Sequence, residues 1–205
     1  MGTWFALSFL LMACGGGGTS SGGGGGSSGA GIDPRLARLD IYEAQKLRVL
    51  GDPGAGVVGM PVAMPEDVPQ MGAMIFDGGV TIRVEDGTTP LVLFGDARVT
   101  VDFDLGAATG NLGNFLGNTS TGAVVDYGGT IALDSASAAQ NLIFTYAGSL
   151  AAQDEALAFD GQMQGTFLGQ PVGALVGADL EATVDHNGQP KAATLVLITE
   201  QSVTP

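Results

Sequence analysis

Apolar and polar residues alternate along the chain from about residue 72 to residue 200. In the segment 98–103, for example, Val99, Val101 and Phe103 alternate with three polar residues. A period of two is typical of a strand that buries one face and exposes the other to solvent. Glycines and turn residues separate these runs, and no long helical pattern interrupts them. The pattern therefore predicts an antiparallel meander of strands.

Ten segments carry this strand pattern, and the turn between the last two is the clearest. They span residues 72–76, 79–85, 90–94, 97–104, 106–115, 124–133, 141–150, 156–164, 174–184 and 192–200. Asn187-Gly188 offers the positive φ that a two-residue hairpin requires. Eight to ten strands of this length close naturally into a small barrel, which leaves no exposed strand edge. The expected fold class is all-β, a small antiparallel barrel of about eight strands over residues 72–205.

The segment 32–71, which precedes the strands, begins with a helix-start signal. Asp33 is a favourable N-cap residue, and Pro34 suits the first helical position. The glycines and proline of residues 51–54 would end the helix. Its apolar face would contain Leu36, Leu39, Leu47 and Leu50. A strand through residues 46–50 is the competing prediction, so a short helix or strand is expected here.

Charge is distributed unevenly between this segment and the barrel. Four of the seven cations of the chain lie at Arg35, Arg38, Lys46 and Arg48, whereas residues 51–205 carry three basic residues against eighteen acidic ones. Contact between the four cations and anionic lipid headgroups is one interpretation. Docking of the segment against the acidic barrel explains the same charges and is favoured. Because an acidic domain repels phosphate backbones, nucleic acid is not expected as a partner.

The chain begins with a short apolar run, residues 4–13, that stops at Cys14, the only cysteine. As a helix the run would span about 18 Å, against a hydrocarbon core of about 30 Å. It is too short to cross a membrane and is typical of a signal peptide. Residues 11–14, Leu-Met-Ala-Cys, resemble the bacterial lipobox. That resemblance implies cleavage after Ala13, a diacylglyceryl group on the Cys14 sulfur and acylation of the freed amine, for example with palmitate.

Residues 15–31 contain eleven of the 35 glycines, separated only by Ser, Thr and Ala. Such a segment has no apolar surface to offset the entropy of ordering, so a flexible tether is expected. The expected organisation is therefore a signal peptide over 1–13, a lipidated cysteine and tether over 14–31, a basic amphiphilic segment and loop over 32–71, and the barrel over 72–205.

The remaining candidates for chemistry do not combine into a known catalytic pattern. His186, the only histidine, has no accompanying signature of an activated serine, so a solvated turn residue is expected. Adjacent carboxylates are expected on solvated faces, because none follows the spacing of a calcium loop. Tyrosines are expected in core or rim packing. These residues are Asp102, Asp104, Glu66, Asp67, Glu85, Asp86, Asp154 and Glu155, and Tyr42, Tyr127 and Tyr146. Neither an enzyme nor a metal site is expected.

Two groups of residues resemble a known family. Residues 93–103, Leu-Phe-Gly-Asp-Ala-Arg-Val-Thr-Val-Asp-Phe, with 109–112, Thr-Gly-Asn-Leu, form the first group. Residues 165–169, Gly-Thr-Phe-Leu-Gly, with 174–177, Ala-Leu-Val-Gly, form the second. Together they are similar to the barrels of transferrin-binding-protein-B-like domains, of the Slam-dependent surface lipoprotein type. A cysteine followed by polyglycine is also similar to the start of these lipoproteins.

The resemblance implies an eight-stranded barrel lipoprotein, lipid-anchored in the outer membrane of a Gram-negative bacterium and often displayed on the cell surface. Members bind host proteins or haem carriers, so a protein or haem-like ligand is expected, and haem is implied by the resemblance alone. No ligand-binding residue can be carried over. A lipocalin-like periplasmic carrier of a small apolar ligand and a structural envelope lipoprotein are the alternative functions. The expected partners are the membrane, through the lipid on Cys14, and one ligand, with the chain as a monomer.

Overall fold

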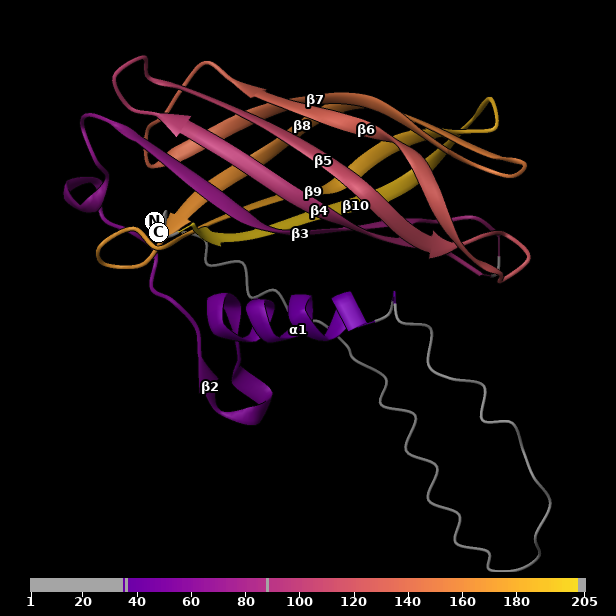
Figure 1. Cartoon of the computed structure of the whole chain (residues 1–205), viewed down its shortest axis with the longest axis horizontal. Helices are drawn as coiled ribbons and strands as arrows, with labels where there is room; N and C mark the ends of the chain where they lie inside the picture. The colour runs from indigo at the N-terminus through magenta and orange to yellow at the C-terminus, as the bar shows by residue number, and fades with distance from the viewer. Residues whose placement is uncertain (1–34, 36, 88, 203–205) are drawn as a thin grey trace, which may run out of the picture. The chain divides into compact units, whose positions relative to one another are not determined.

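Eight antiparallel strands close into a barrel in the computed structural model of the chain, which describes residues 35, 37–87 and 89–202. Strands that follow one another in the sequence are neighbours in space, and the last strand pairs with the first, in the order β10-β3-β4-β5-β6-β7-β8-β9. Figure 1 shows this barrel with a helix, α1, along one side of its wall. The predicted all-β fold with about eight barrel strands is confirmed.

The elements before the barrel are one α-helix, a short two-stranded hairpin and two 3-10 helices of one turn each. They are α1 (Ala37–Leu50), β1 (Gly51–Asp52), η2 (Pro53–Ala55), β2 (Val57–Val58) and η3 (Pro65–Asp67). The barrel strands are β3 (Ala73–Val84), β4 (Leu91–Asp102), β5 (Ala107–Asn118), β6 (Val124–Ser135), β7 (Asn141–Ala152), β8 (Glu155–Leu168), β9 (Ala174–His186) and β10 (Gln189–Gln201). Of the two predictions for residues 46–50, the helix is the correct one. The turn between β9 and β10 is the predicted hairpin, with φ of 53° at Asn187 and 79° at Gly188.

The ten predicted strands become eight because two of the expected breaks lie inside long strands. Segments 72–76 and 79–85 join in β3, which pairs with β4 without interruption from Ala73–Asp102 to Val84–Leu91. Segments 90–94 and 97–104 likewise join in β4. The intervening glycines do not turn the chain. Gly78, between the first two segments, instead lies against the carbonyl oxygen of Ile198 on β10, and Gly95, between the other two, makes room for the ring of Phe115. A Cβ at Gly78 would lie 2.2 Å from that oxygen, and one at Gly95 would lie 2.6 Å from that ring.

Bulky side chains fill the interior of the barrel along its length. Alternate residues along most of the strands point inward and are buried, as alternation predicts. Three aromatic rings form a chain across the core, since Phe167 lies 5.9 Å from Phe76 and 6.0 Å from Phe103 between ring centroids. At the adjacent end of the barrel, Ala63 and Val68 of the entering segment join the same cluster. That end is therefore closed by apolar side chains.

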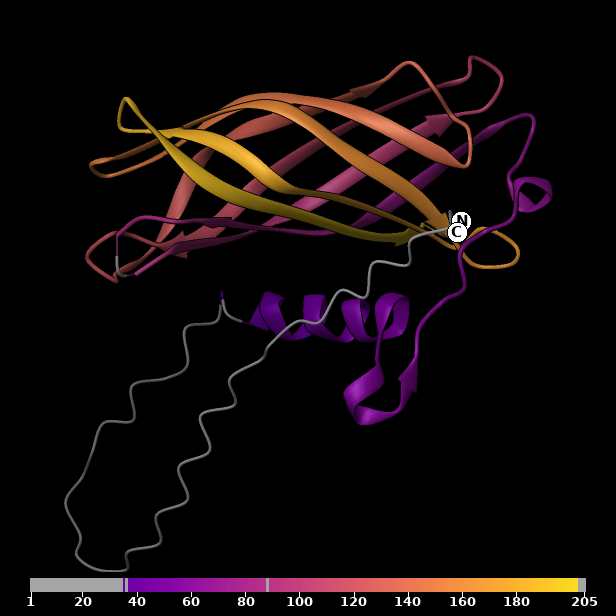
Figure 2. The same cartoon turned by 180° about the vertical axis from the view of Figure 1, so that it is seen from behind.

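Helix α1 lies along the outside of the barrel, next to β3 and β10. Both views place it beside the same part of the wall, with the hairpin of β1 and β2 on the far side of the helix (Figures 1 and 2). The described residues form one compact unit, so the described part of the segment before the barrel packs against it.

Candidate functional site

Helix α1 docks on an apolar strip of the outer barrel surface. Its buried residues are Tyr42, Gln45 and Val49, which follow the spacing of one helical face. The strip consists of Leu168, Ala174 and Ile198, with the partly buried Phe94, Val176 and Val196 at its edges. The Gln45 side chain, which lies within this face, donates a hydrogen bond of 3.0 Å to the carbonyl oxygen of Asp77. The amide nitrogen of this buried side chain is therefore satisfied.

The predicted apolar face of the helix is wrong. Leu47 and Leu50 are exposed, Leu39 is half-buried, and Leu36 lies outside the described residues. The side of α1 that packs against the barrel is the one that carries Tyr42 and Val49, and Leu39, Leu47 and Leu50 lie outside it. The helix consequently keeps exposed apolar side chains on its other side.

Ion pairs fix the helix to the barrel at both ends and confirm the predicted docking. Nearest nitrogen–oxygen distances are 2.7 Å for Arg35–Asp126, 2.7 Å for Arg38–Asp96 and 2.6 Å for Arg48–Glu200. Arg38 also donates to the carbonyl oxygen of Asn114 at 2.8 Å. These pairs are partly exposed, so solvent screens them and their contribution to stability is small. Their main effect is to orient the helix.

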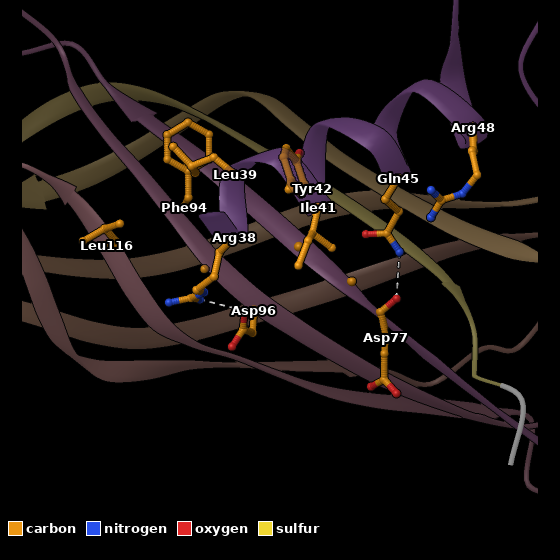
Figure 3. Close-up of a pocket in the computed structure, with 13 residues that line it drawn as sticks. Arg38, Leu39, Ile41, Tyr42, Gln45, Arg48, Asp77, Phe94, Asp96 and Leu116 are labelled. Atoms are coloured by element: carbon orange, nitrogen blue, oxygen red, sulfur yellow. Dashed lines mark hydrogen bonds and ion pairs between the residues drawn. The ribbon is translucent and has the colours of Figure 1, made fainter. Parts of the chain in front are cut away.

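A groove of about 310 Å³ remains between one edge of α1 and the barrel wall (Figure 3). Its apolar surface comes from Leu39, Ile41, Tyr42, Phe94 and Leu116. The Tyr42 and Phe94 rings meet edge to face at a centroid distance of 6.2 Å. Charged and amide groups line its rim, namely Arg38, Gln45, Arg48, Asp77 and Asp96. An apolar floor with a few polar groups at the rim is the usual composition of a binding site.

Replacing Gly79 with valine is expected to displace α1 and to destroy this groove. A Cβ at Gly79 would lie 2.2 Å from Cδ2 of Tyr42. Overpacking of this kind costs about 1–3 kcal/mol, and here it is relieved by moving the helix. Urea unfolding and hydrogen exchange of the α1 amides measure both effects. Gly113→Val is the matched control, because its Cβ would meet nothing nearer than 3.5 Å. Equal exchange of α1 in both variants would contradict the expectation.

The other end of the barrel holds a cluster of ionisable side chains, two of which are buried. His186 Nε2 and Glu155 Oε2 are 2.5 Å apart, and both residues are only 5% exposed. Ser120 donates to Glu155 Oε1 from its backbone nitrogen at 2.8 Å and from its hydroxyl at 2.6 Å. On the opposite side of the imidazole, Nδ1 lies 3.7 Å from Asp86, which pairs with Lys191 at 2.8 Å. The cluster closes this end with satisfied polar groups.

Two predictions about these residues are wrong. His186 is not a solvated turn residue, because closure of the barrel places the β9 terminus against the start of β8. Glu155 is likewise not part of a solvated face. The residues do not form a nucleophile triad, since the Ser120 hydroxyl donates to the carboxylate and not to the imidazole. Burial raises the pKa of Glu155, but the hydrogen bonds from Ser120 and the contact with His186 outweigh it, so the net pKa is lowered.

The other predicted residues have structural positions of their own. Asp102 accepts a hydrogen bond from the Leu105 backbone at 2.9 Å in the turn after β4, and Asp67 accepts one from Met64. The tyrosines are buried, as predicted. Tyr127 donates to the carbonyl oxygen of Asn118 at 3.0 Å, and Tyr146 to Asp179 at 2.8 Å. Within the described residues, no group of three His, Cys, Asp or Glu side chains is placed to hold a metal ion.

The predicted lipidation and cleavage residues, Cys14 and Ala13, lie outside the described residues. Among the helices of the described part of the chain, none has the length and apolar character needed to cross a membrane. No protein-family model matches the chain, and a comparison with curated proteins gives no match either. The resemblance to transferrin-binding-protein-B-like domains therefore stays a prediction from the sequence.

Proposed function

We propose that the chain is a lipid-anchored binding protein of the outer membrane, presented at the cell surface, whose ligand site is the groove between α1 and the barrel. The observation that carries the ligand site is the apolar groove on the outside of a barrel whose interior is filled. The proposed location rests on the lipobox-like residues 11–14 and the glycine-rich residues 15–31.

Groove chemistry favours a protein ligand over haem. The groove lining contains no histidine, cysteine or methionine, and its one tyrosine, Tyr42, is buried under the helix. These four residue types are the usual axial ligands of haem iron. Arg38 and Arg48 on the rim are engaged by Asp96 and Glu200, so they are not placed to receive haem propionates. An aromatic or aliphatic side chain of a partner protein fits the apolar floor.

The barrel interior gives less support to a lipocalin-like carrier. A carrier of that type needs an unfilled lumen, and eight strands enclose only a small volume. Large side chains such as Phe76, Phe144 and Phe167 occupy the interior and are fully buried. The two hollows identified among the described residues both lie on the outer surface of the barrel.

Protease treatment of intact cells tests the proposed location. We expect the protease to remove the wild-type domain from intact cells, because the lipid on Cys14 would hold it at the outer surface. Cys14→Ala removes the acceptor thiol, so the variant is expected inside the cell or in the medium. Ser20→Ala, within the glycine-rich segment, serves as the matched control and is expected to behave as wild type. A wild-type domain that is protected until the outer membrane is broken would instead indicate a periplasmic protein.

A further inference from the structure

The cluster of ionisable side chains at the end of the barrel joins four separate parts of the chain. His186 ends β9, Glu155 begins β8, Asp86 follows β3, and Lys191 lies near the start of β10. The turn between β9 and β10, drawn in yellow in Figure 1, marks this end of the barrel. His186 is the only histidine of the chain. A change in its protonation would therefore act on several strand ends at once.

Each ring nitrogen of His186 faces a carboxylate. Nε2 lies 2.5 Å from Glu155 Oε2, and Nδ1 lies 3.7 Å from Asp86 Oδ2. A neutral imidazole carries one N–H, so its other nitrogen presents a lone pair. With either tautomer, that lone pair would point at a carboxylate oxygen and be repelled by it. Only the imidazolium, which has two N–H groups, offers a proton to both carboxylates.

Protonation of the ring also balances the charge of the cluster. Glu155 and Asp86 bring two negative charges, and Lys191, 2.8 Å from Asp86 Oδ1, brings one positive charge. A neutral His186 leaves one negative charge uncompensated, whereas the imidazolium cancels it. His186 and Glu155 are each only 5% exposed, so water screens this charge poorly. Ser120 occupies Glu155 Oε1 with two hydrogen bonds, which leaves Oε2 for the ring.

The other polar groups around the ring do not replace either carboxylate. Asn187 Nδ2 lies 3.3 Å from His186 Nε2, farther away than Glu155 Oε2. The two arms of one exposed ion pair bond each other, one phenol donates to a backbone carbonyl, and two carboxylates are exposed. These groups are Arg83 and Glu85 beside β3, Tyr127 on β6, Asp154 before β8 and Asp185 on β9.

We propose that His186 is a proton-operated clasp: the charged ring holds Asp86 and Glu155 together, and the neutral ring holds only Glu155, the nearer of the two. Asp86 keeps Lys191 as a partner when the proton leaves. Loss of the proton therefore loosens the residues after β3 without opening the barrel. Histidine suits this role because it is the side chain that normally changes charge near neutral pH. The proposal does not depend on the ligand groove or on the lipid anchor.

The single histidine allows a direct test by nuclear magnetic resonance. The full chain is labelled with ¹⁵N, purified without a histidine tag, and titrated from about pH 5 to about pH 9, on both sides of the range in which histidine normally titrates. Ring nitrogen shifts report the charge and the tautomer. We expect two protonated nitrogens at the acid end and a proton on Nε2 alone at the alkaline end.

Two variants are expected to move the midpoint of this titration in opposite directions. Asp86→Asn removes one carboxylate and frees the Lys191 cation, so the midpoint should fall by about 1 pH unit. Lys191→Ala removes the cation that competes for Asp86, so the midpoint should rise by a similar amount. Asp154→Asn is the matched control, because it neutralises an exposed carboxylate next to Glu155 in the sequence. Its midpoint is expected to equal that of the wild type, because solvent screens an exposed charge.

Hydrogen exchange of the backbone at residues 85–87 shows whether the proton controls this end of the barrel. Protection in the wild type is expected to fall above the midpoint, and in Asp86→Asn it should not follow the ring titration. A ring that stays neutral or stays charged over the whole range would refute the clasp. Equal midpoints for Asp86→Asn and Asp154→Asn would refute it as well, since His186 would then act with Glu155 alone. Constant protection in the wild type would leave a histidine that titrates without holding the strand ends, which also overturns the proposal.

Discussion

Replacing His186 with alanine is expected to lower the free energy of unfolding by about 3–5 kcal/mol. The substitution leaves the Glu155 carboxylate buried at the end of the barrel without the imidazole that contacts it at 2.5 Å, although Ser120 still donates two hydrogen bonds. A buried charge that loses its partner cannot recover the solvation that folding removed. Urea unfolding at neutral pH, monitored by circular dichroism, measures the change.

Arg83→Ala is the matched control for this experiment. Arg83 pairs with Glu85 at 2.6 Å, nearly the same distance as in the buried pair, but both side chains are about half exposed. We expect a loss of about 0–1 kcal/mol, because water replaces the lost contact. Equal losses in the two variants would mean that the His186–Glu155 pair is no more than a surface ion pair.

A double-mutant cycle separates the pair from its surroundings. Glu155→Ala combined with His186→Ala removes both side chains of the contact, so the double variant is expected to lose less stability than the sum of the two single variants. The contribution of Glu155 to the free energy of unfolding also depends on pH. Because its pKa is lowered in the fold from an ordinary 4.5, its contribution is present above that value and disappears as the pH falls through the lowered pKa. Glu155→Gln is expected to flatten this acid dependence.

The barrel could be predicted from the sequence because its strands and turns are specified by residues that are neighbours in the chain. Alternation such as that of Val99, Val101 and Phe103 fixes which face is buried, and Asn187-Gly188 fixes a hairpin. Breaks at residues 77–78 and 95–96 were wrongly predicted because a glycine that admits a close neighbour inside a strand has the same sequence signal as a glycine in a turn. Only the positions of the Ile198 carbonyl oxygen beside Gly78 and of the Phe115 ring beside Gly95 distinguish the two cases.

The groove and the buried cluster could not be predicted because they depend on contacts between distant residues. His186 and Glu155 are 31 positions apart, and each looks like a solvated turn residue until the barrel closes. The docked face of α1 contains Gln45, which an apolar pattern does not select, although its side chain is satisfied by a β3 carbonyl. Charge was the better guide, since the excess of cations in residues 35–48 correctly predicted docking on an acidic barrel.

The three tyrosines of the chain are expected to resist ionisation until the protein unfolds. Burial is the main cause in each case. It raises the pKa of Tyr42 and Tyr146 and, together with the charge of Glu155, raises that of Tyr127 to about 12. The hydrogen bond from Tyr146 to Asp179 raises the pKa of Tyr146 further. All three values exceed the ordinary 10.0, so the folded state holds these protons more tightly than the unfolded state does.

The free energy of unfolding is therefore expected to fall at alkaline pH. The tyrosine contribution is fully present below pH 10 and is lost as the pH rises through the raised values. At a pH of about 11 an unfolded tyrosine is mostly ionised, so tyrosinate absorbance should be nearly absent in the folded chain and present in urea. Asp179→Asn removes the acceptor charge beside Tyr146 and is expected to let one tyrosine of the three ionise earlier. A folded chain whose tyrosines all titrate near 10 would show that their hydroxyl groups are open to water.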